Sequence, residues 1–191
     1  MNMIKKLLKQ REAAIVLIVL GLSIIMTIAS SVFLTYQNIV ALLLGMSIEV
    51  IIAVGMANLM ASGGFDMSVG SILAFSGVCA GLVLKAGMPP IVAVVVGIVI
   101  GGLVGLFNGF IIAKLEINAF VTTLASLSLF RGLTLIVTRG QNVSGLGDAF
   151  NAIGQKVVLG VQAPIWYAII LVIIGDILMR HSRFFRQNYY I

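Results

Sequence analysis

Long apolar runs separated by short polar segments dominate the pattern along the chain. A helix that crosses a membrane needs about 20 mostly apolar residues. Six runs approach that length, at residues 13–33, 39–60, 68–84, 91–113, 118–138 and 164–179. The pattern therefore predicts an all-α fold, a polytopic transmembrane bundle of about six spans that forms a single domain over residues 1–191.

The composition agrees with a membrane protein and excludes a soluble enzyme. Of the 191 residues, 61% are hydrophobic and 9% are charged, and the mean hydropathy is +1.19. Soluble domains are roughly half apolar and a quarter charged, so these helices require membrane lipid around them. The one cysteine, Cys79, and the one histidine, His181, make no metal cluster, and no phosphate-binding loop is present. We expect no enzymatic activity, no bound metal or cofactor, and no nucleic-acid partner.

Positive charges flank the apolar runs. Four cations precede the first run and three follow the last: Lys5, Lys6, Lys9, Arg11, Arg180, Arg183 and Arg186. Cytoplasmic segments are enriched in Lys and Arg, and an even number of spans places both ends on one side. The first run is long for a signal peptide, so we interpret it as a retained helix. Both termini are predicted to be cytoplasmic, and the long polar segment 138–164 extracytoplasmic.

The stretch Ala61–Ser71, ASGGFDMSVGS, is unusual for a helix that faces lipid. It places paired glycines, a carboxylate and two serines between two apolar runs. Non-helical backbone at membrane depth is tolerated only where protein buries it or where it lines a watery cavity. The alternative is an ordinary cytoplasmic turn in which Asp66 or Ser68 caps the next helix. Both interpretations can hold together.

A glycine stripe marks the fourth run. Four glycines recur every four residues and are predicted to form a helix-packing face: Gly97, Gly101, Gly105 and Gly109. Small residues at this spacing let another membrane helix approach closely. Asn108 adjoins the stripe, and we expect it to form hydrogen bonds to a neighbouring helix rather than to a ligand.

Three further charges lie within or at the edge of apolar runs. Glu49 or Asp66 is a candidate ion-pair partner for Arg131, because charges in membrane spans tend to face the bundle interior and pair. Asp176 precedes Arg180 by one helical turn, which predicts a local ion pair.

The segment Val54–Gly77, VGMANLMASGGFDMSVGSILAFSG, closely resembles a signature of the permease subunits of ribose-type sugar ABC importers, VGMTxVxxxGGIDLSVGSxxALxG. The resemblance continues in order through Gly105–Gly145, similar to GxxNGxxVxxxxIxxFIxTLxxxxxxRGxxxxxTxGxxV. It ends in RHSRFFRQNYYI, which is similar to the T.FGR..YA segment. The resemblance therefore covers nearly the whole chain, within the branched-chain amino acid and ribose-type permease family.

This resemblance implies a permease that imports a ribose-like monosaccharide across the cytoplasmic (inner) membrane of a prokaryote. Its implied partners are a separate ATPase subunit that hydrolyses ATP, an extracytoplasmic sugar-binding protein, and a second permease copy, either identical or a paralogue. The implied residues of the substrate pathway are Gly63, Gly64, Asp66, Ser68, Ser71, Asn118, Phe120, Thr123 and Arg131.

The chain also departs from the family pattern. Phe65 and Met67 stand where Ile and Leu are usual, which keeps apolar bulk. Relatives continue beyond this point into the loop that docks on the ATPase and into later spans, whereas this sequence stops at Ile191. We therefore expect it to be a C-terminally truncated permease.

Two other functions stay open at this stage. An ion-coupled secondary carrier or channel would use Asp66, Glu49 and Arg131 as a relay. A non-transporting, truncated membrane remnant would have a purely apolar bundle interior.

Overall fold

The computed structural model of the protein describes residues 11–182. The elements, in chain order, are α2 (Arg11–Ala29), α3 (Tyr36–Ala61), α4 (Val69–Lys85), α5 (Pro90–Lys114), α6 (Ala119–Thr138), α7 (Asp148–Gln155), β1 (Val157–Val158), β2 (Val161–Gln162) and α8 (Ala163–His181). Helices account for most of the chain, so the predicted all-α class is confirmed. Five of the tail cations lie outside the described residues: Lys5, Lys6, Lys9, Arg183 and Arg186.

Six of the described helices are apolar and match the six predicted runs. Four of them, α3, α5, α6 and α8, are long and apolar enough to cross a membrane. The other two, Ala13–Ala29 within α2 and the whole of α4, are shorter. The chain is therefore a multi-pass membrane protein. The first helix ends at Ala29 rather than at residue 33, because a turn separates it from α3.

The chain divides into two compact units, Met1–Met46 and Ser47–Ile191, and α3 runs across the boundary. In the first unit the turn before α3 is held by side chains. Asn38 Nδ2 donates to the Phe33 carbonyl at 2.7 Å, and Thr35 Oγ1 accepts from the Asn38 N–H at 3.4 Å. The second bond satisfies an N–H that the start of the helix leaves without a backbone partner, and the first ties the helix to the turn before it.

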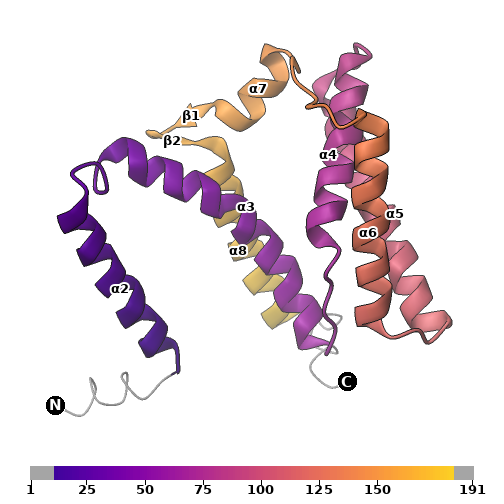
Figure 1. Ribbon diagram of the computed structural model, residues 1–191, viewed down its shortest axis with the longest axis horizontal. Coiled ribbons are helices and arrows are strands. Elements are labelled where there is room, and N and C mark those ends of the chain that lie inside the picture. Colours follow the sequence, from indigo (N-terminus) through magenta and orange to yellow (C-terminus); the bar gives the residue numbers. More distant parts are fainter. Residues whose placement is uncertain (1–10, 183–191) are drawn as a thin grey trace. The chain divides into compact units, whose positions relative to one another are not determined.

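In the second unit, α4, α5 and α6 lie side by side (Figure 1). Short connections join them, and each has a local cause. Gly87, with φ of 84°, ends α4, and Pro90 opens α5 at its first turn. Asn118 caps α6 by accepting the N–H of Phe120 at 2.9 Å.

The interior of this three-helix group is made of small and polar side chains. Its buried residues include Ala80, Ala93, Ser71, Asn108 and Ser126. One aromatic pair, Phe75 with Phe130 at a centroid distance of 5.4 Å, joins α4 to α6. Large apolar side chains cover the outer faces. This distribution suits helices whose outer surface meets lipid and whose contacts depend on close packing and hydrogen bonds.

The polar segment 138–164 contains structure that the sequence pattern did not predict. It holds α7 and a two-residue antiparallel strand pair, β1 with β2. Aromatic side chains of α8 fasten it: Trp166 Nε1 donates to the Val158 carbonyl at 3.0 Å, and the Tyr167 hydroxyl donates to the Ile153 carbonyl at 3.2 Å.

Candidate functional site

The paired glycines of the ASGGFDMSVGS stretch end α3. Gly63 has a φ of 77°, a left-handed conformation that favours glycine. The Gly63 N–H donates to the Met60 carbonyl at 3.0 Å, and the Gly64 N–H donates to the Leu59 carbonyl at 3.0 Å. A Cβ at Gly64 would lie 2.9 Å from Leu59 Cδ1. Gly63 is therefore required by its backbone conformation, whereas a side chain at Gly64 would require Leu59 to shift.

A directional chain of hydrogen bonds links the residues after this turn to two other helices. Ser126 of α6 donates through Oγ to Asn108 Oδ1 at 2.5 Å, and Asn108 of α5 donates through Nδ2 to Ser68 Oγ at 3.1 Å. Ser68 in turn donates through Oγ to Asp66 Oδ1 at 2.5 Å. Hydrogen bonds in a row polarise one another, and this row ends on a carboxylate.

Burial makes this chain the polar centre of the three-helix group. Ser68 is fully buried, and Asn108 and Ser126 are 3% and 4% exposed. Asp66 Oδ1 also accepts the backbone N–H of Ser68 at 2.7 Å. Asp66 therefore holds the residue just before α4, whereas no side chain caps the start of that helix, so the predicted capping by Asp66 or Ser68 is not found. The expectation that Asn108 bonds to a neighbouring helix is confirmed.

The same bonds place the start of α4 well inside the helix group. Ser126 lies seven residues after the first residue of α6, and Asn108 lies six residues before the last residue of α5. At 1.5 Å per residue, Ser68 is recessed by about 9–10 Å from the end that α5 and α6 share. The structure thus favours a break within the depth of the bundle, with Asp66 bonded to the residue just before α4.

Two cavities flank the recessed start of α4. One, of about 290 Å³, is lined by Asp66 and Asn108 together with Thr123, which is 1% exposed. The other, of about 420 Å³, lies between α4 and α6 and is lined by Ser71, Arg131 and six further residues. Cavities on both sides of a broken helix are what the pathway interpretation requires.

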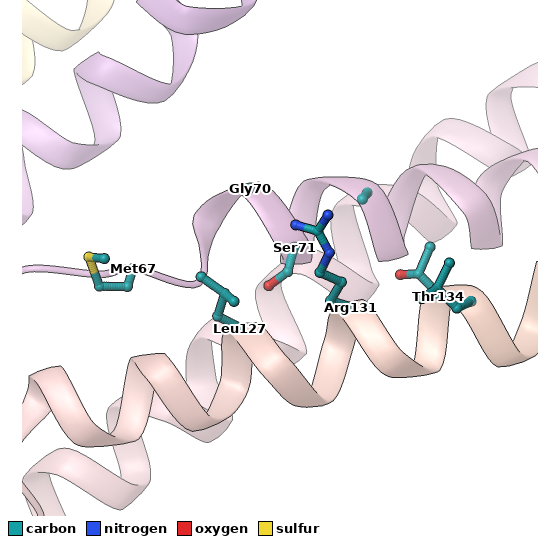
Figure 2. Close-up of a pocket in the computed structure, with 8 residues that line it drawn as sticks. Met67, Gly70, Ser71, Leu127, Arg131 and Thr134 are labelled. Atoms are coloured by element: carbon teal, nitrogen blue, oxygen red, sulfur yellow. The ribbon is translucent and has the colours of Figure 1, made fainter. Parts of the chain in front are cut away.

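Arg131 enters the larger cavity from α6. Figure 2 shows its side chain extended toward the first turn of α4, beside Ser71. Among the residues that the structure describes, Arg131 forms no ion pair with Glu49 or Asp66, so that predicted pairing is wrong. Glu49 is exposed on α3, and Asp66 lines the other cavity. The predicted pair of Asp176 and Arg180 is confirmed, at 2.7 Å.

The remaining predicted pathway residues fall into two groups. Gly63, Gly64, Asp66, Ser68 and Ser71 surround the break, and Thr123 lies in the smaller cavity. Asn118 and Phe120 instead form the start of α6. The Asn118 side chain is engaged as the helix cap, and Phe120 is 54% exposed. A role for these two residues in the pathway stays a prediction.

The glycine stripe of α5 is only partly used within the chain. A Cβ at Gly97 would lie 3.5 Å from Ala80 Cβ of α4, so this glycine lies at a helix contact. A Cβ at Gly101, Gly105 or Gly109 would meet no atom within 4 Å among the described residues. Their helix-packing role stays a prediction.

Sequence reasoning missed two polar residues of the site. Ser126 completes the hydrogen-bond chain, and Thr134 lines the larger cavity next to Arg131. Both lie on one face of α6 with other hydroxyl residues. In the sequence, polar residues recur every three to five positions within this apolar run, and that spacing could have indicated a polar face on the helix.

The family model for the permease component of branched-chain amino acid transport systems matches residues 38–187. The chain belongs to this permease family. The match begins just inside α3 and covers the break, both cavities and α8. No solved structure matches the chain.

Several curated relatives are similar to the permease over most of its length. The L-arabinose ABC transporter permease protein of Azospirillum brasilense is 36% identical over 173 residues, which are 91% of this chain and 51% of the relative. The ribose import permease protein of Bacillus subtilis is 36% identical over 170 residues, 88% of this chain and 53% of the relative. The ribose import permease protein of Escherichia coli K12 is 33% identical over 189 residues, which are 97% of this chain and 58% of the relative. The chain spans about half the length of the curated relatives it matches.

Proposed function

We propose that this permease is the transmembrane subunit of an ATP-binding cassette importer that moves a monosaccharide across the cytoplasmic membrane of a prokaryote. The relatives are named for L-arabinose and ribose import, which supports a small sugar as the solute. The observation that carries the proposal is the recessed break at Asp66–Ser68 with a cavity on each side, each lined by apolar residues and a few polar side chains. Such a break lets a hydrophilic solute meet polar groups inside an apolar bundle.

The proposed partners supply what the described residues do not contain. A separate ATPase subunit hydrolyses ATP, so this chain binds no cofactor of its own and is not an enzyme. An extracytoplasmic binding protein delivers the sugar, and a second permease copy completes the pathway. Both termini are proposed to be cytoplasmic. The proposed pathway residues are those around the break, in the two cavities and at the start of α6: Gly63, Gly64, Asp66, Ser68, Ser71, Asn118, Phe120, Thr123 and Arg131.

Co-purification and uptake test this function together. The tagged protein, extracted from its native membrane in mild detergent, is expected to carry an ATPase subunit. Uptake of radiolabelled L-arabinose or ribose by vesicles that contain the assembly is expected to require ATP and to survive collapse of the membrane potential. Uptake that follows the potential and ignores ATP would instead establish an ion-coupled carrier. Absence of both ATPase and uptake would favour a non-transporting protein.

Replacing Asp66 with alanine is expected to lower uptake about tenfold without loss of protein from the membrane. The carboxylate accepts two hydrogen bonds at the start of α4. A bond to a charged group contributes roughly 1.5–3 kcal/mol to the folded structure, so without these bonds the segment before α4 is expected to occupy its native conformation about tenfold less often. Asp148→Ala, an exposed carboxylate on α7, is the matched control. Wild-type uptake by Asp66→Ala would remove this residue from the pathway.

A further inference from the structure

The larger cavity, between α4 and α6, has a distinct arrangement of hydrogen-bond donors and acceptors. Its three polar side chains are Ser71 of α4 and Arg131 and Thr134 of α6. The hydroxyl of Ser71 donates to the Ser68 carbonyl at 2.8 Å, and that of Thr134 donates to the Phe130 carbonyl at 2.7 Å. Both hydroxyl protons are therefore engaged, and each oxygen has lone pairs left only to accept.

Arg131 supplies the complementary chemistry. A guanidinium group carries five N–H donors and no acceptor. None of the eight residues that line this cavity is acidic, and Arg131 forms no ion pair among residues 11–182. The cavity thus presents donors from one side chain and acceptors from two others, with a positive charge that no lining residue neutralises.

A neutral polyol uses all of these groups at once. A carboxylate anion without hydroxyl groups could accept from Arg131 but could not donate to Ser71 or Thr134. A neutral polyol both accepts and donates through each hydroxyl. The apolar lining of Met67 and Leu127 suits the C–H faces of such a solute, and about 420 Å³ lies within the roughly 300–1,000 Å³ of small-molecule sites.

We propose that the α4–α6 cavity is a subsite for a neutral polyhydroxylated solute, in which Arg131 donates, Ser71 and Thr134 accept, and the charge of Arg131 repels cationic solutes. The identity of the solute as a monosaccharide rests on the proposed function. The assignment of the donor, the acceptors and the charge selection is specific to this cavity. Arg131 is thereby a specificity-determining residue and not a structural ion-pair partner.

A cysteine placed in the cavity tests the electrostatic part of this proposal without relying on transport. Ala74 lines the cavity and is exposed, so Ala74→Cys leaves the three polar groups in place. The variant is made in the assembled protein with Cys79 and any other cysteine replaced. A negatively charged thiosulfonate reagent is expected to label it about tenfold faster than a positively charged one. Arg131→Gln is expected to abolish the difference, and Arg139→Gln, at the end of the same helix, to preserve it.

Protection by solutes tests the ligand class. Millimolar L-arabinose or ribose is expected to slow labelling of Ala74→Cys at least about threefold, and Arg131→Gln to remove the protection. Thr138→Cys, one turn beyond Thr134 and outside the lining, is expected to show no protection. Protection by inorganic phosphate or glycerol phosphate but not by sugar would overturn the proposal in favour of a free anion or a lipid headgroup. No protection by any solute would also overturn it.

Two readouts separate this proposal from the proposed function. Sugar uptake is measured in the same vesicles as labelling. Normal uptake without protection would overturn the subsite alone, and protection without uptake would overturn the import function alone. If Arg131→Gln does not reach the membrane, Arg131→Lys serves in its place. It keeps the charge but loses the planar donor set, so it is expected to retain the reagent preference and lose sugar protection.

Discussion

Valine in place of Ser68 is expected to be the most damaging single change in the described bundle, lowering stability by about 2–4 kcal/mol and abolishing transport. Ser68 is fully buried where α4, α5 and α6 meet. The substitution adds volume at a fully buried site. It also removes the acceptor of the Asn108 amide and one donor to Asp66. Unfolding in a detergent titration of the assembled protein measures the first effect, and sugar uptake the second.

Two further variants separate volume from hydrogen bonding at this position. Ser68→Ala removes the same two bonds without adding bulk and is expected to cost about 1–2 kcal/mol, since such bonds in membrane bundles are individually modest. Ser23→Val is the matched control, because the Ser23 hydroxyl donates to the Val19 carbonyl of its own helix and Ser23 lines neither cavity. A Ser68→Val protein as stable as the wild type would contradict the tight three-helix junction.

Valine in place of Gly81 is expected to detach the segment after α6 from α4 and to cost about 2–3 kcal/mol. A Cβ at Gly81 would lie 2.9 Å from Val143 Cγ1 and 3.6 Å from Leu146 Cδ2. Val143 is β-branched and stiff, so it gives way only if the segment moves. Faster proteolysis of the segment at residues 139–147 and a lower unfolding temperature are the measurements.

The neighbouring turn of the same helix offers a control for this prediction. Gly77→Val is expected to be nearly neutral, because a Cβ at Gly77 meets no atom within 4 Å among the described residues. Val143→Ala should restore most of the lost stability in the Gly81→Val background, since it removes the methyl group that clashes. Because valine has a higher helix propensity than glycine, failure of that double variant to recover would indicate that the new side chain clashes with atoms other than this methyl group.

The six apolar helices could be predicted from the sequence because the hydrocarbon core of a membrane requires each span by itself to be long and apolar. Long apolar runs specify their own secondary structure, and Pro90 and Asn118 mark helix starts at the residue level. The local pair of Asp176 and Arg180 was predictable for the same reason, since four residues along one helix set the distance.

Contacts between helices were predicted less well. The sequence singled out Asp66 and Arg131 as charges that needed partners, and it suggested that Arg131 pairs with Asp66 or with Glu49. They lie in different cavities on the two sides of α4. Asp66 is satisfied by Ser68, two residues away. A short-range bond within a turn thus replaced a long-range ion pair.

The sequence by itself determined that this protein is a multi-pass helical membrane permease with a polar interruption at Ala61–Ser71, because hydropathy and the order of motifs are properties of the chain. Only the tertiary structure decided how deep the interruption lies. That depth depends on Ser68, Asn108 and Ser126 meeting at one level, and the level follows from how three helices are offset along their axes. Such an offset is set by packing and by hydrogen bonds between distant residues, which leave no periodic pattern in the sequence.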